Sequence, residues 1–199
     1  MRKTRSFMAV LFVLASTAVL AADVYDIDVA HSQVGFTVKH LGISTVPGKF
    51  EKFSGTITLT REDPAAAKVE ATIDATSIDT GVETRDKHLK SPDFFDVARF
   101  PELKFVSTKN SPLKDGRFVM EGKLTMHGVT KPVKMDVQFG GKAKDPWGGE
   151  RAAFTASTTI NRKDFGVSYN KVLDNGGLMV SDEVNITLQI EAVKRTPKK

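Results

Sequence analysis

Alternation of apolar and polar side chains with a period of two residues constrains the fold of this chain more than any other feature. In residues 133–139, VKMDVQF, every odd position is apolar and every even position is polar. Residues 184–190, VNITLQI, repeat the pattern. Successive side chains of an extended chain point to opposite faces of a sheet. Each stretch therefore predicts a strand with one buried and one solvated face.

Similar stretches recur along the chain, at 24–29, 34–40, 56–60, 68–74, 103–107, 118–126 and 154–160. Turn-forming residues separate them, at 63–64, 114–116, 140–141, 145–149 and 175–177. Strands joined by such short connections pair antiparallel. The sequence thus predicts eight or nine half-buried strands in a largely antiparallel sheet.

The sequence offers little helix to cover the apolar face of this sheet. The best helical candidate is 82–90, with Asp79 and Thr80 as N-caps and a further turn at 91–97. A sheet without helical cover must bury its own apolar face, as a sandwich or a closed barrel. The strands expected at 50–60 and 68–77 are about ten residues long, and strands of this length favour a long barrel. An eight-stranded barrel is either filled by side chains or holds one small ligand, and the alternation leaves both open.

The first residues have the layout of a cleavable export signal. A short cationic segment is followed by an uncharged apolar stretch at 7–20 and by the small residues Ala21 and Ala22. The apolar stretch is shorter than the ~20 residues that a membrane-spanning helix needs. We therefore expect a signal peptide at 1–21, no membrane span, and a mature protein in the periplasm.

Charge and cysteine content narrow the function further. The net charge of +5 comes from the signal and from a basic tail at 194–199, and the rest of the chain is slightly acidic. A nucleic-acid partner is therefore not expected, because such binding needs a basic patch on the folded body. The chain has no cysteine, which excludes disulfides and a cysteine-linked lipid anchor. The expected organisation is a signal at 1–21, one barrel domain at 22–193, and the tail.

Four segments resemble the YceI-like family of periplasmic, lipocalin-like proteins. They are HLG with GKF at 40–50, SIDT with RDKHLKSPDFFD at 77–96, GKLTMHGVTKPV at 122–133, and DPWGGER with DFG at 145–166. The resemblance implies an all-β, eight-stranded antiparallel lipocalin-like barrel with a short helical segment near one mouth. It also implies an apolar lumen that holds a long-chain amphiphile, such as a polyisoprenoid, a quinone or a fatty amide. Members are often dimeric, so a homodimer is a further implied partner.

The predicted helix carries the polar candidates for ligand binding. Arg85, His88 and Leu89 are three and four residues apart and share one face. Arginine and histidine beside an apolar mouth suit a polar head group, and the planar guanidinium suits a diphosphate. The alternative is that these side chains fasten the helix to the barrel rim. His40, at the end of a strand, is expected in the lumen or at the rim.

The remaining candidates are apolar. Phe94 and Phe95, followed by Phe100, are expected to form either a lid over a lipid tail or a plug for that end of the barrel. Inward-facing strand positions predict the lumen wall, and they are Phe118, Met120, Leu124, Met135 and Val137.

Three functions remain open at this point. The first is a carrier for a long-chain amphiphile. The second is a filled barrel with a structural or stress-response role, and the third is a lipid-modifying enzyme. We expect no metal and no cofactor, because the four histidines lack close ligand spacing and cysteine is absent. A Gly-x-Ser-x-Gly elbow is also absent, so catalysis is not expected.

Overall fold

The computed structural model describes residues 22–60, 63–174 and 176–196. The predicted signal peptide at 1–21 lies outside the described residues. The strands are β1 (Ala22–Ile27), β2 (Gln33–His40), β3 (Ser44–Phe50), β4 (Phe53–Thr60), β5 (Lys68–Asp74), β6 (Ile78–Asp79), β7 (Glu102–Asn110), β8 (Arg117–Met126), β9 (Val129–Lys144), β10 (Glu150–Asn161) and β11 (Val180–Lys194). One α-helix, α1 (Glu83–Lys90), accompanies them in the described part of the chain.

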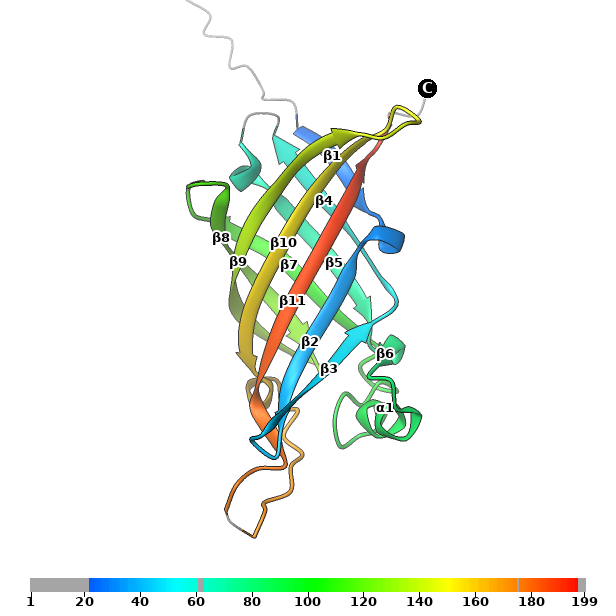
Figure 1. Cartoon of the computed structure of the whole chain (residues 1–199), viewed down its shortest axis with the longest axis vertical. Helices are drawn as coiled ribbons and strands as arrows, with labels where there is room; N and C mark the ends of the chain where they lie inside the picture. The colour runs from blue at the N-terminus through cyan, green and yellow to red at the C-terminus, as the bar shows by residue number, and fades with distance from the viewer. Residues whose placement is uncertain (1–21, 61–62, 175, 197–199) are drawn as a thin grey trace, which may run out of the picture.

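The strands close into a barrel (Figure 1). Antiparallel pairing runs β1-β4-β5-β7-β8-β9-β10-β11, and β11 pairs back onto β1. Strand β2 extends the position of β1 in the barrel, because it also pairs with β11. Strand β3 pairs with β2 and extends the position of β4. The short strand β6 pairs with β3 where β5 has ended. The molecule is therefore the closed eight-stranded antiparallel barrel that the resemblance implies, whereas the alternation alone leaves a sandwich or a barrel open.

Two strands that the sequence predicts as continuous are shorter in the structure. The predicted strand 50–60 is wrong in this respect, because Phe50 ends β3 and Phe53 begins β4. Between them, the amide of Lys52 donates to Ser77 Oγ at 3.0 Å, and the Lys52 carbonyl accepts from the Asp74 amide at 2.9 Å. The predicted strand 68–77 likewise ends at Asp74, whose carboxylate accepts from the Thr76 amide. At these two places, hydrogen bonds between side chains and the backbone take the place of hydrogen bonds between strands.

The expected turn at 140–141 is also wrong. Strand β9 continues to Lys144, and its register to β10 shifts beside Ala153 and Phe154. Gly141 has a φ of +107°, which a side chain would strongly disfavour. The glycine pair therefore forms a bulge within a long strand, and the chain reverses only at 145–149.

Helix α1 begins without the caps that the sequence suggests. Its N-cap is Val82, which makes no side-chain capping bond. Asp79 instead accepts from the Gly81 amide at 2.8 Å, and Thr80 donates to the Asp86 carboxylate. Gly81 has a φ of +77°, and this turn separates both predicted caps from the first helical residue.

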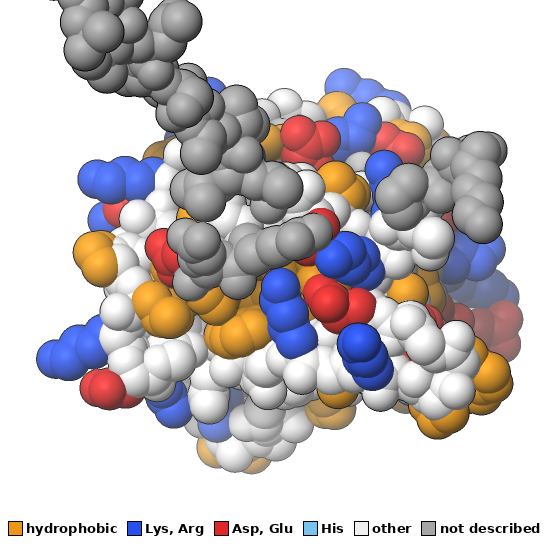
Figure 2. All heavy atoms as spheres, turned by 90° about the horizontal axis from the view of Figure 1, so that it is seen from above, with side chains coloured by type: hydrophobic (Ala, Val, Ile, Leu, Met, Phe, Trp, Pro, Cys, Tyr) orange, Lys and Arg blue, Asp and Glu red, His pale blue; other side chains and the backbone are white. Residues whose placement is uncertain are grey.

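The barrel has one packed end and one end beside α1. Tyr25, Leu59 and Ala192 are fully buried in the packed end, which also carries both ends of the described chain (Figure 1). Figure 2 views this end and shows acidic and basic side chains interspersed on it. A second apolar cluster, including Phe94 and Phe165, lies towards α1.

Candidate functional site

A cavity of about 420 Å³ occupies the barrel between the packed end and α1. Its wall is almost wholly apolar and takes side chains from β1 to β5 and from β7 to β11. Ile57, Phe105 and Phe154 belong both to the packed-end cluster and to this wall, so they form the floor. The volume falls within the roughly 300–1,000 Å³ of typical ligand pockets. The interior is therefore hollow enough to hold a ligand.

The predicted site residues converge on this cavity, with one exception. The lining includes His40, Arg85, His88, Leu89, Phe94, Phe95, Met120, Leu124, Met135 and Val137. Phe118 is buried but does not line the cavity, and it packs instead with Tyr25 and Leu59 in the packed end. Alternation identifies the face of a strand, while the depth of a residue depends on its position along the barrel axis.

Arg85 both fastens α1 and lines the cavity. Its Nε donates to Thr80 Oγ1 at 2.7 Å, and its Nη2 donates to the Thr80 carbonyl at 2.8 Å. Asp86 binds the same threonine, so both side chains hold the turn before α1, and their attachment to the barrel rim stays a prediction. Within the described residues, Arg85 has no carboxylate partner. A half-buried cation therefore stands at the edge of an apolar cavity, where charge-assisted hydrogen bonds are strong.

His88 belongs to an aromatic cluster at the mouth. Its Nε2 lies 2.8 Å from Asp93 Oδ2. Its ring meets Phe94 and Tyr169 edge-on, with centroids 5.1 Å and 5.0 Å away. Tyr169 was not among the sequence candidates, because it lies in the irregular connection between β10 and β11. The cluster joins α1 to that connection across the mouth.

The other phenylalanines after α1 have separate positions. Phe95 contacts Phe50 of β3 edge-on at 5.8 Å and lines the cavity. Phe100 packs instead against His127, 4.7 Å away in the turn between β8 and β9. Phe94 and Phe95 therefore lie at the cavity and Phe100 does not, while their role as a lid or a plug stays a prediction.

Arg162 is a buried residue of the wall that the sequence candidates omit. It is 4% exposed. Its guanidinium donates to the carbonyls of Val167, Tyr169 and Ser181 at 2.7, 2.8 and 3.0 Å, and lies 3.3 Å from Asp182. Burial lowers the pKa of Arg162, while the Asp182 charge opposes that shift. The alternation of β10 carries the signal, since Phe154 and Ile160 face inward and Arg162 continues their phase.

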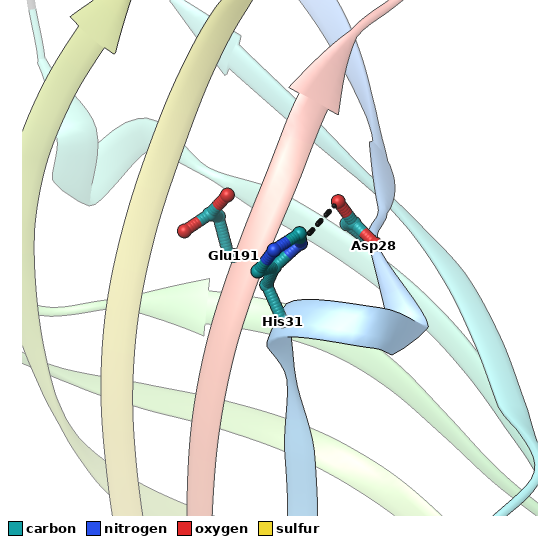
Figure 3. Close-up of side chains that lie close together, drawn as sticks. All are labelled: Asp28, His31 and Glu191. Carbon is teal, nitrogen blue, oxygen red and sulfur yellow. Dashed lines mark hydrogen bonds and ion pairs between the residues drawn. The ribbon is translucent and has the colours of Figure 1, made fainter. Parts of the chain in front are cut away.

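A cluster of possible metal ligands lies outside the cavity. Asp28, His31 and Glu191 place their ligand atoms within 4.8 Å of one another (Figure 3). The Arg151 guanidinium already lies 2.7 Å from Asp28 and 2.5 Å from Glu191. Asp28 also lies 2.9 Å from His31 Nδ1. The hydrogen bond from Arg151, and after it the one from His31, lowers the pKa of Asp28 to about 2. The group is thus an ion-pair network that joins β1, β10 and β11.

A membrane-crossing helix would need both length and apolarity. No helix in the described part of the chain is both long and apolar enough to cross a membrane.

Comparison with known proteins places the chain in a family. The model of the YceI-like domain matches residues 25–192. A UPF0312 protein of Shewanella sp. strain MR-7 is 40% identical over 185 residues, which cover 92% of this chain and 94% of that protein. A UPF0312 protein of Photorhabdus laumondii is 42% identical over 185 residues, with 92% of each chain covered.

Solved structures agree with this assignment. BcnA of Burkholderia cenocepacia is 26% identical, with a TM-score of 0.73 over 83% of this chain and 98% of that one. The YCEI protein of Campylobacter jejuni is 32% identical, with a TM-score of 0.69 over 79% and 90%. A polyisoprenoid binding domain from Saccharophagus degradans is 15% identical and shares the fold, with a TM-score of 0.60 over 86% and 98%. The chain belongs to the YceI-like family.

Proposed function

We propose that this protein is a periplasmic carrier that holds a long-chain amphiphile, such as a polyisoprenoid, a quinone or a fatty amide, in its barrel. The observation that carries the proposal is the apolar cavity of about 420 Å³. Burial of an alkyl or prenyl chain gains roughly 25 cal/mol per Å² of apolar surface. The polyisoprenoid binding domain from Saccharophagus degradans adds support at the level of the fold.

The cavity volume argues against the alternative of a filled barrel. A lipid-modifying enzyme is also less well supported. Histidine is the most frequent general acid or base, and His40 and His88 line the cavity, but in the described part of the chain no hydrogen bond joins either ring to another cavity-lining side chain. A binding role needs only the apolar wall and a head-group contact at the mouth.

Lipid extraction from the purified protein, followed by mass spectrometry, tests the carrier role. We expect a long-chain amphiphile at up to one molecule per barrel. The proposal fails if the protein carries no such molecule and also does not bind added ubiquinone or prenyl diphosphate. Cell fractionation and sequencing of the mature N-terminus test the periplasmic location, with Ala22 as the expected first residue. Sedimentation tests the implied homodimer.

We further propose that Arg85 contacts the polar head of the ligand. Arg85→Gln should weaken binding of a prenyl diphosphate by about tenfold or more, because a charge-assisted hydrogen bond contributes ~1.5–3 kcal/mol. Binding of the uncharged prenol should change little. Titration of both ligands measures the two affinities. Lys87→Gln on the exposed side of α1 is the matched control. An equal loss for the alcohol and the diphosphate would assign Arg85 to fastening alone.

A further inference from the structure

Four apolar side chains stand exposed at the mouth of the barrel, and we call them the lip. They are Leu41 and Ile43 in the turn between β2 and β3, and Val172 and Leu178 in the connection between β10 and β11. Their exposures are 40%, 84%, 72% and 36%. Exposed large apolar side chains that gather at one place mark interaction sites.

The two parts of the lip belong to one surface. The Leu41 amide donates to the Met179 carbonyl at 2.9 Å, and His40 pairs with Val180. Val172 and Leu178 pair across their own hairpin. Figure 1 shows both hairpins projecting at the end of the barrel opposite the chain termini.

The lip continues directly into the cavity wall. His40, Met179 and Val180 line the cavity, and they are the sequence neighbours of Leu41 and Leu178. The lip residues themselves do not line it. The lip thus stands directly beside residues that line the cavity at its mouth.

Leu41 adds a backbone observation. It has a φ of +54°, a conformation that is uncommon and strained for a bulky residue. The next residue, Gly42, has a φ of +73°, and the Ile43 amide donates to the His40 carbonyl at 3.1 Å. Leu41 and Gly42 are therefore the central residues of a β-turn of the type that needs two positive φ angles. Glycine or asparagine would suit the position of Leu41 better, so its apolar side chain is present despite the strain.

The partner that best fits this surface is a phospholipid bilayer. The lip side chains sit on two protruding hairpins, so they can enter a fluid layer without a shaped counterpart. Lys39 and Lys171 flank them, and neither forms an ion pair with a described residue, although Lys39 Nζ bonds Thr45 Oγ1. Asp174 is the one carboxylate within residues 39–45 and 170–180. Exposed lysines at this position suit anionic head groups.

We propose that the lip docks on the surface of a phospholipid bilayer and that the ligand passes between bilayer and cavity at this contact. This inference rests on the proposed carrier function. An apolar chain that moves through such a contact does not have to cross water. The apolar cavity stabilises the chain for the same reason, because it keeps apolar surface out of water.

Flotation with vesicles of phosphatidylethanolamine and phosphatidylglycerol tests the docking. The double variant I43S/V172S should bind vesicles at least about tenfold more weakly, because each aliphatic side chain loses its burial. The variant V106S/L113S is the matched control, since Val106 and Leu113 are 46% and 40% exposed away from the lip. Lys39→Glu with Lys171→Glu should weaken binding only when phosphatidylglycerol is present.

Delivery of ubiquinone separates this inference from the carrier function. In detergent, I43S/V172S should bind ubiquinone as the unaltered protein does, while its uptake from vesicles slows about tenfold or more. Failure of the unaltered protein to float with vesicles would overturn the docking and leave ubiquinone binding in detergent to decide the carrier function. A dimer that I43S/V172S dissociates would also overturn it, because a second copy would then cover the lip.

Discussion

Gly122 shows how one missing side chain shapes the inner face of the barrel. It lies on β8 opposite Ser107 of β7, in phase with the inward-facing Met120 and Leu124. A Cβ atom there would overlap the Phe105 ring and lie 2.8 Å from the Val106 carbonyl oxygen. The absence of a side chain thus lets the ring of Phe105 cover the strand and form part of the cavity floor.

Gly122→Ala should lower the free energy of unfolding by about 1–3 kcal/mol, because an added methyl group in a packed interior forces its neighbours to shift. Urea denaturation measures the loss. Gly35→Ala is the control, since the nearest atom to its added Cβ would be 3.5 Å away. Equal stability of the two variants would show that Phe105 moves freely and that Gly122 is not required.

At the scale of elements, ion pairs reinforce the strand pair that closes the barrel. Strands β1 and β11 share only the pairs Tyr25–Lys194, Asp26–Val193 and Ile27–Ala192. Lys194 lies 2.6 Å from Asp23, and Arg195 lies 2.7 Å from Asp26. The first two residues of the predicted tail are therefore held against β1, while the boundary of the tail itself stays a prediction.

Asp28 makes this seam sensitive to acid. Its pKa is lowered to about 2, chiefly by the hydrogen bond from Arg151. Because the pKa of Asp28 is lower in the folded protein than the 3.8 of the unfolded chain, its ionised carboxylate stabilises the fold at pH values above 3.8. This stabilisation disappears as the pH falls towards 2. Asp28→Asn should therefore cost about 2 kcal/mol near neutral pH and almost nothing near pH 2.

Urea denaturation across this pH window measures the difference. Asp136→Asn is the control, because Asp136 is exposed on β9 and forms no ion pair with a described residue. A constant gap between Asp28→Asn and the unaltered protein at every pH would contradict the electrostatic explanation.

Arg162 holds a second element, the connection between β10 and β11. Arg162→Met should destabilise the protein by about 2–4 kcal/mol, because buried carbonyl groups and Asp182 lose their donor. Limited proteolysis should then cut within 167–181 faster. Lys163→Met is the control, since Lys163 pairs with the same Asp182 from an exposed position. Unchanged proteolysis in Arg162→Met would show that the aromatic cluster alone retains the connection.

The whole molecule is a barrel that is solid at one end and hollow at the other. The packed end carries both ends of the described chain, and the hollow end carries α1 and the two hairpins that bear the lip (Figure 1). This asymmetry allows the packed end to supply stability while the mouth exchanges a ligand.

Ala156→Phe should fill much of the cavity without unfolding the barrel. Ala156 lines the cavity from β10, and a phenyl ring there would occupy the space of an alkyl or prenyl chain. We expect loss of ubiquinone binding, measured by titration, with an unchanged circular dichroism spectrum. Thr155→Phe, which points outward from the adjacent position, should bind normally. Full binding by Ala156→Phe would place the ligand outside the barrel.

Much of the fold and part of the candidate site could be predicted because period-two alternation is local. It identifies which face of each strand is buried, and hence Met120, Leu124, Met135 and Val137 as inward residues. It does not show the strand breaks: inward positions change phase between Tyr25 and Val34, and again between Phe50 and Phe53. Short turns at these breaks shift the alternation by one residue.

The sequence by itself determined the family, the all-β class and the faces of the strands, because these depend on neighbouring residues and on long specific segments. Only the tertiary structure decided that Phe118 lies in the packed end while Met120 lines the cavity. It also decided that Tyr169, whose carbonyl Arg162 holds, packs against His88 of α1, and that Leu41 and Val172 share one lip. The physical reason is that depth along the barrel and contacts between distant segments follow from strand register and closure, which no local pattern encodes.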